Sequence, residues 1–251
     1  MSDAINTGGG AVINGVRGIV FDMDDTLYLE RDYVRSGFQA VAASLSEQCG
    51  LSRNEAFEFL WGLFELGVRG DTFNRLLIAY PQLAGTCSPP ELIDIYRAHV
   101  PSISLAPEIF QLLDELRESG LKLGLISDGP LASQRAKYQA LKLESYFDPA
   151  LLTDEWGREF WKPHPRAFKS VMEAWDMLPH ELVYIADNPI KDFLAPKRLG
   201  WHTVRLRLTP QQSFVQAPAS SDHAPDREVS SITELIATCR EFCAPPAAAH
   251  T

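Results

Sequence analysis

Apolar runs that are too short for helices predict the strands of a parallel sheet. The first run covers residues 18–21, and others follow at 121–126, 150–152, 182–185 and 203–206. Runs that are apolar throughout, without alternation, suit a sheet covered by helices on both faces. After the second run, helical patterns lie between successive runs. Strands that alternate with helices predict a Rossmann-like, doubly wound α/β fold.

The stretch between the first two runs has a different character. Its apolar side chains recur at helical spacing, no strand pattern interrupts them, and glycines and prolines divide the stretch into separate helices. We therefore expect an all-helical cap domain inserted after the first strand. The expected organisation is a flexible N-terminal arm (1–16), a sheet core (17–31 and 101–243), the helical cap (32–100) and a disordered tail (244–251).

Composition narrows the class of protein. The 251 residues are 45% hydrophobic and 22% charged, as is typical of a folded globular protein. The 33 acidic and 23 basic residues give a formal charge of −10. Because such a chain has no surplus of cations, we expect no nucleic-acid partner. The sequence lacks an apolar run long enough for a transmembrane helix, so we expect no membrane partner either.

The cysteines and the N-terminal pattern indicate a cellular setting. Four cysteines are too few and too scattered for a disulfide scaffold. Residues 1–17 show neither the basic start nor the apolar stretch of an export signal. We therefore expect a cytoplasmic protein, either a monomer or a homodimer.

Polar side chains follow the expected strands at the edge where open parallel sheets bind their ligands. Most of them are carboxylates, and they are joined by one hydroxyl and one lysine. In chain order they are Asp22, Asp24, Asp25, Ser127, Asp128, Gly129, Lys162, Asp187, Asn188 and Asp192.

These residue types indicate phosphoryl chemistry. Carboxylates held close together repel one another and require a cation. A small number of hard oxygen ligands suits Mg²⁺, which is therefore the expected cofactor. With Lys162 on the other side, such a metal would form a positive hollow for a phosphoryl group. A carboxylate could then attack a dianion that would otherwise repel it.

Four short motifs carry a resemblance to a known family. They are FDMDDTL (21–27), LISDG (125–129), WKP (161–163) and IADNPIKD (185–192), each at an expected strand end or in the following loop. With them the chain resembles the haloacid dehalogenase superfamily, in its phosphatase branch with a helical cap after the first strand. The resemblance covers about residues 18–242.

The resemblance implies a role in catalysis for three residues. Asp22 would be the nucleophile that takes the phosphoryl group as an aspartyl-phosphate. Asp24 points to the same side of an extended chain, and would act as general acid and then as general base. Lys162 would neutralise the nucleophile and the developing charge.

The resemblance also implies binding roles. The Asp22 carboxylate, the Asp24 backbone carbonyl and the Asp187 carboxylate would hold Mg²⁺. Asp192 would be an outer residue of the metal site or an occasional direct ligand. The phosphoryl oxygens would be bound by the Ser127 hydroxyl and the backbone N–H groups of Asp128 and Gly129.

Three positions bear on which member of the family this is. Asp25 and Ala186 stand where the family often has glycine, and aspartate tolerates unusual backbone angles better than most residues. Dehalogenases of the superfamily lack the second acidic residue, because a halide leaving group needs no proton. Asp24 therefore favours phosphate esters over haloacids.

The cap is expected to select the substrate, because the core recognises only the phosphoryl group. Arg69, in the turn at residues 67–71, is a candidate substrate contact. We expect a small phosphate ester, with sugar phosphates favoured by a faint resemblance of residues 187–193 to members associated with carbohydrate pathways. The alternatives are a phosphosugar mutase, a dehalogenase, a phospho-accepting signalling module and a non-catalytic phosphate- and Mg²⁺-binding module.

Overall fold

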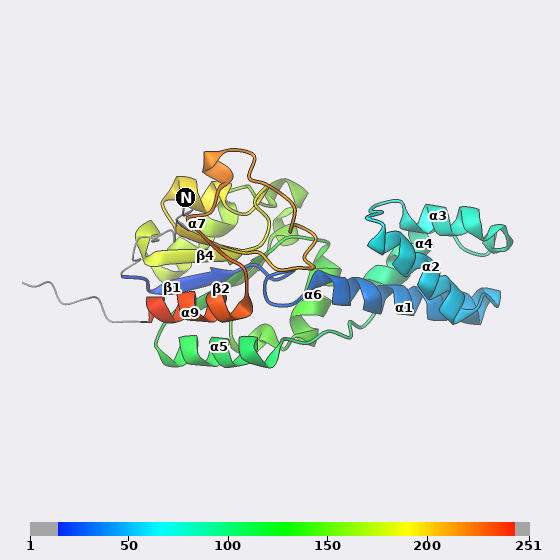
Figure 1. Ribbon diagram of the computed structural model, residues 1–251, viewed down its shortest axis with the longest axis horizontal. Coiled ribbons are helices and arrows are strands. Elements are labelled where there is room, and N and C mark those ends of the chain that lie inside the picture. The colour runs from blue at the N-terminus through cyan, green and yellow to red at the C-terminus, as the bar shows by residue number, and fades with distance from the viewer. Residues whose placement is uncertain (1–14, 244–251) are drawn as a thin grey trace, which may run out of the picture. The chain divides into compact units, whose positions relative to one another are not determined.

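The sheet of this protein is parallel throughout. The computed structural model describes residues 15–243, so the expected tail and most of the expected N-terminal arm lie outside the described residues. Within these described residues, six strands form one sheet in the order β3-β2-β1-β4-β5-β6 (Figure 1). They are β1 (Gly18–Phe21), β2 (Lys122–Ser127), β3 (Ala150–Leu152), β4 (Leu182–Ala186), β5 (His202–Leu206) and β6 (Arg227–Val229).

The central position of β1 determines where the polar strand ends meet. Phe21, its last residue, is in register with Leu125 of β2 and with Ile185 of β4. Because all three strands run in the same direction, the residues that follow them emerge at one edge of the sheet. The expected α/β fold is thus confirmed. The short edge strand β6 was not expected, because its three residues include two charged side chains.

Helices cover both faces of the sheet, which explains why its central strands β1 and β4 are buried along their whole length. The helix α7 (Arg166–Trp175) lies on one face, where Phe168 and Val171 pack in a cluster with Val20 of β1. The helices α5 (Pro107–Glu118) and α9 (Ile232–Phe242) lie on the other face (Figure 1). The short helix α8 (Leu194–Leu199) follows β4 in the chain.

The remaining helices belong to a second compact unit, formed by Tyr28–Ser104 and Pro130–Glu144. Its own core contains Val41, Leu60 and Leu92, and its described residues include no strand. The all-helical insertion after β1 is therefore present. Its helices are α1 (Glu30–Cys49), α2 (Arg53–Glu65), α3 (Thr72–Ala79), α4 (Pro89–Ala98) and α6 (Leu131–Ala140).

The helix α6 groups with this helical unit, through contacts with α4 among others. The domain boundaries expected from the sequence assign α6 to the sheet core, and those boundaries stay a prediction. Within residues 15–243, none of the helices has the length and apolar content that a membrane span requires. Short 3₁₀ turns complete the structure: η1 (Pro81–Leu83), η2 (Leu143–Ser145), η3 (Thr153–Trp156), η4 (Arg158–Phe160), η5 (Pro179–Glu181) and η6 (Ser221–His223).

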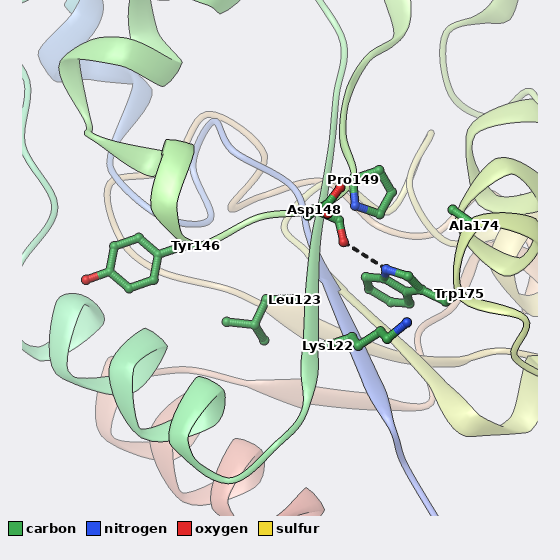
Figure 2. A pocket seen from close by; sticks show the side chains of 7 residues that line it. All are labelled: Lys122, Leu123, Tyr146, Asp148, Pro149, Ala174 and Trp175. Atoms are coloured by element: carbon green, nitrogen blue, oxygen red, sulfur yellow. Dashed lines mark hydrogen bonds between the residues drawn. The ribbon is translucent and has the colours of Figure 1, made fainter.

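Trp175 packs against the backbone near the amino ends of two strands. A Cβ atom on Gly18 would lie 2.6 Å from the Trp175 ring, and one on Gly124 would lie 3.0 Å from it. The Trp175 indole donates a hydrogen bond to the Asp148 carbonyl at 2.8 Å (Figure 2). A pocket of about 320 Å³ beside it is also lined by Lys122, the first residue of β2. This pocket lies toward the amino end of the sheet, away from the polar strand ends.

We expect Gly18→Ala to destabilise the protein, because the added methyl group overlaps the Trp175 ring. Overpacking of this kind costs about 1–3 kcal/mol. Urea unfolding measures the change. Gly62→Ala is the matched control: a Cβ there meets nothing within 4 Å, and alanine in the middle of a helix favours the folded state by about 0.5–1 kcal/mol. Equal unfolding midpoints for the two variants would contradict the packing described here.

Candidate functional site

Asp22 lies at the edge of the sheet in a position set by the backbone. It follows β1 directly, and its N–H donates to the Ile185 carbonyl at 2.9 Å. That bond extends the pairing of β1 and β4 by one residue. The Asp22 side chain is buried, and its Oδ2 lies 3.5 Å from the hydroxyl of Thr26. The nucleophile expected from the sequence therefore stands on a rigid part of the fold.

Three buried carboxylates gather at this edge. Asp22, Asp187 and Asp192 each offer an oxygen, and these atoms lie within 4.8 Å of one another. The Lys162 ammonium lies 2.6 Å from Asp22 Oδ1 and 2.8 Å from Asp192 Oδ1. It also donates to the Tyr184 hydroxyl at 2.9 Å. The structure thus brings together four of the residues that the sequence singled out, although they come from three separate segments.

The charges of this cluster do not balance by themselves. Two ammonium groups, those of Lys162 and Lys191, face four carboxylates, those of Asp22, Asp128, Asp187 and Asp192. Buried like charges are unfavourable without a further cation. Hard oxygen atoms at this spacing fit a divalent cation such as Mg²⁺. Asp192 Oδ2 accepts the Asn188 N–H at 2.9 Å, and Asp192 Oδ1 lies 2.8 Å from the Lys162 ammonium without forming a hydrogen bond. Asp22, Asp187 and Asp192 are therefore all candidates for direct metal ligands.

The pKa values reflect this imbalance. Burial raises the pKa of Asp22 to about 6, against the opposing effect of Lys162. Burial also raises the pKa of Asp187 well above its ordinary value, and the neighbouring Asp192 and Asp22 add to that effect. Burial alone would lower the pKa of Lys162, but the carboxylates of Asp192 and Asp22 outweigh it and raise the pKa. The lysine is therefore a permanent cation of the site.

Asp128 connects the loop of Lys162 to the end of β2. Its two carboxylate oxygens accept the Lys162 backbone N–H at 3.2 Å each, and Oδ1 also accepts the Thr153 hydroxyl at 2.7 Å. The Lys191 ammonium lies 3.6 Å from Oδ2. Ser127 and Gly129 flank Asp128 at the same strand end. The Asp128 side chain thus holds protein groups, and a contact between its backbone N–H and a phosphoryl group stays a prediction.

The turn after Asp22 contains a residue in the left-handed backbone conformation. Asp25 has φ 55°, a conformation that costs a residue with a Cβ roughly 1–2 kcal/mol and explains why the resembling family often has glycine there. Its carbonyl accepts the Gln211 side-chain amide at 2.6 Å, and its carboxylate accepts the Gln212 N–H at 3.0 Å. These bonds offset the strain. Asp24, just before it, is half-buried.

Arg69 belongs to the helical unit rather than to the strand-end cluster. Its guanidinium donates to the backbone carbonyls of Phe64 at 2.8 Å and Val68 at 2.9 Å, and it lies 3.9 Å from the centre of the Phe64 ring. These contacts hold the C-terminal end of α2. A contact between Arg69 and substrate stays a prediction.

Several residues of the site were not singled out by sequence reasoning. Tyr184 sits in an apolar strand, where an aromatic residue usually signals packing alone. Thr153 and Ser213 are hydroxyl residues in loops without a recognisable motif. Lys191 was missed as well, although its position could have indicated a role, because it precedes Asp192 inside the IADNPIKD motif.

Comparisons with known proteins identify the family of this chain. The family described as haloacid dehalogenase-like hydrolase matches residues 19–206. The glyceraldehyde 3-phosphate phosphatase of Methanopyrus kandleri is 27% identical over 234 residues, which cover 90% of this chain and 98% of that protein. The ribulose-1,5-bisphosphate 5-phosphatase of Halopiger xanaduensis is 23% identical over 236 residues, with coverages of 86% and 96%.

A solved structure shows the same fold. It is that of a HAD family hydrolase from Deinococcus radiodurans R1, with bound phosphate and sodium. The two structures superpose with a TM-score of 0.61 at 21% identity, over 93% of this chain and 99% of the other. At this level of identity the likeness concerns the fold alone.

This chain belongs to the haloacid dehalogenase-like hydrolases, since the family match spans more than half of it. The resemblance inferred from four motifs is thereby confirmed. Within the family the chain is a phosphatase, as its relatives indicate.

We expect the raised pKa of Asp22 to appear as a pH-dependent loss of stability in metal-free buffer. The folded carboxyl has a pKa of about 6, compared with an ordinary value of 3.8. Between these values the folded state binds more protons, so this group's contribution to the free energy of unfolding falls as the pH rises. Asp22→Asn removes the titration. From about pH 4 to about pH 7, Asp22→Asn should gain roughly 2–3 kcal/mol relative to the wild type.

Urea unfolding with a chelator, repeated across this pH range, measures the difference. Asp94→Asn, at an exposed position of α4, is the control for the loss of one carboxylate. A constant difference for Asp22→Asn would show that the carboxyl titrates normally.

Proposed function

We propose that this protein is a Mg²⁺-dependent phosphomonoesterase that acts through an aspartyl-phosphate on Asp22. The observation that carries the proposal is the buried cluster of Asp22, Asp187 and Asp192 around the Lys162 ammonium, with 2.6 Å between Lys162 Nζ and Asp22 Oδ1. A nucleophilic carboxylate, a permanent cation and a site for a second cation are the three groups that attack on a phosphate ester requires.

The first step is attack by a carboxylate oxygen of Asp22 on the phosphorus atom. The bond from phosphorus to the ester oxygen breaks as the new bond forms. Asp24 gives its proton to the departing oxygen, which leaves as an alcohol. Asp24 is half-buried rather than enclosed, so it can reach both a bound substrate and water.

The second step releases phosphate. Asp24, now ionised, takes a proton from a water molecule, and the resulting hydroxide attacks the phosphorus atom. The bond between phosphorus and Asp22 breaks, and the carboxylate is restored. Throughout both steps Lys162 remains ionised and stabilises negative charge that develops on the phosphoryl oxygens.

Binding of the phosphoryl group falls to the end of β2. The Ser127 hydroxyl and the backbone N–H groups of Asp128 and Gly129 donate to its oxygens. Mg²⁺, held by the carboxylates of Asp22 and Asp187 and the carbonyl of Asp24, would offset the charge of nucleophile and substrate as they approach. Asp192 acts mainly by holding Lys162, at 2.8 Å from its ammonium.

The substrate is a small phosphorylated metabolite, and a sugar phosphate is favoured. The relatives named as phosphatases of glyceraldehyde 3-phosphate and of ribulose-1,5-bisphosphate support this class. We assign substrate selection to the helical cap (32–100), with Arg69 as a candidate contact, and the chemistry to the core (17–31 and 101–243). A cytoplasmic location agrees with four cysteines that are all free thiols.

We expect Asp22→Asn to abolish phosphatase activity, because an amide cannot form the covalent intermediate. With p-nitrophenyl phosphate and Mg²⁺, kcat should fall by at least about 1,000-fold, and a chelator should abolish wild-type turnover. Asp94→Asn, which removes an exposed carboxylate, should keep full activity.

This assay, together with assays of halide release and of sugar phosphate isomerisation, separates the alternatives. Phosphatase activity retained in Asp22→Asn would overturn the assignment of the nucleophile. Halide release from 2-haloacids, with no phosphate release from any ester, would make the chain a dehalogenase. Isomerised product from a sugar phosphate, formed with a sugar bisphosphate as activator, would identify a mutase.

A further inference from the structure

The loop after β5 contacts two of the strand ends that carry the carboxylate cluster. The Ser213 hydroxyl donates to Asp187 Oδ2, and Ser213 is buried. The Gln211 side-chain amide donates to the Asp25 carbonyl at 2.6 Å, and the Gln212 N–H donates to the Asp25 carboxylate at 3.0 Å. We call residues 211–213 the strap. It joins the turn after β1, which holds Asp22, to the end of β4, which holds Asp187.

A buried arginine in β5 holds the strap through a hydrogen bond to its backbone. Arg205, in β5, is in register with Ala186, the last residue of β4. Its guanidinium donates to the Asp187 carbonyl at 2.9 Å and to the Ser213 carbonyl at 3.0 Å. One side chain thus sets the distance between the backbone of Asp187 and that of Ser213, and the Ser213 hydroxyl is held against the Asp187 carboxylate.

The polar groups of Gln211 are also satisfied. Its side-chain amide donates to the Leu206 carbonyl at 3.1 Å in addition to the Asp25 carbonyl, and its side-chain oxygen accepts the Leu208 N–H. Gln211 is 5% exposed. A buried amide side chain whose donors and acceptor all form hydrogen bonds is held in one conformation, so Gln211 can support the strap rigidly.

We propose that Ser213 is a positioning residue that prepares Asp187 to bind the metal ion of the site. A hydroxyl that donates to one carboxylate oxygen fixes the rotation of the carboxylate, which leaves the other oxygen for a cation. The inference rests on the proposed function for the identity of the site. It adds a residue from a loop outside the four motifs, and it assigns the strap the task of holding the two strand ends together.

The test is the affinity for Mg²⁺, measured by titration calorimetry on the full chain without substrate. Loss of an outer hydrogen-bond partner typically costs 10- to 100-fold in metal affinity. We expect Ser213→Ala to weaken Mg²⁺ binding at least about tenfold and Ser213→Thr, which keeps a hydroxyl, to restore most of it. Ser220→Ala, at an exposed position of the same loop, should bind Mg²⁺ like the wild type.

A second variant covers the case in which Ser213→Ala does not fold. Gln211→Ala removes one of the hydrogen bonds between the strap and Asp25 without a change of charge, and it too should weaken Mg²⁺ binding. Unchanged Mg²⁺ affinity in a folded Ser213→Ala protein, or in Gln211→Ala if the first is unfolded, would overturn the inference. Lack of Mg²⁺ binding by the wild type would instead refute the metal site of the proposed function, together with any role for the strap in it. Loss of thermal stability without a change in affinity would show a purely structural role.

Discussion

The ion pair between Lys162 and Asp22 is the interaction on which the rest of the site depends. Both groups are buried, and a buried charge is costly unless it is paired and hydrogen-bonded. Lys162 meets that condition through Asp22, Asp192 and Tyr184. Its backbone is held in turn by the carboxylate of Asp128. Removal of Lys162 would leave the buried carboxylates of Asp22 and Asp192 without their nearest cation, whereas removal of Asp22 would leave Lys162 paired with Asp192.

The parallel sheet makes this arrangement possible. Because β1, β2 and β4 are neighbours and end at the same edge, residues more than a hundred positions apart in the chain meet within hydrogen-bond distance. The carboxylates outnumber the cations there, and that surplus fits a divalent metal. The strained turn at Asp25 and the strap at residues 211–213 belong to the same system, because each fixes a segment that carries a carboxylate.

Much of this could be predicted from the sequence, for identifiable reasons. Apolar runs reveal strands of a covered sheet, and every strand except β6 followed from them. Asp22, Lys162 and Asp187 could be placed together because ligands of such sheets lie at the strand ends. What the sequence could not show are partners that depend on the reach of a side chain. The Tyr184 hydroxyl and the Ser213 hydroxyl are of this kind, and so is the buried guanidinium of Arg205.

The grouping of α6 with the helical unit was also beyond sequence reasoning. A helix that follows a strand in an alternating pattern is expected to cover the sheet, and only its contacts assign it elsewhere. Arg69 is a second case in which the sequence pattern does not reveal the contacts of a residue. An arginine in a loop can bind a ligand, but here it also donates to the carbonyls at the end of its own helix.

The most direct test of the central claim is a crystal structure with Mg²⁺ and beryllium fluoride, which mimics a phosphoryl group. We expect the beryllium atom to be bonded to a carboxylate oxygen of Asp22, with Lys162 and Ser127 in hydrogen-bond contact with the fluorides. A mimic bound at any other residue, or held away from Asp22 by water, would contradict covalent catalysis by this carboxylate.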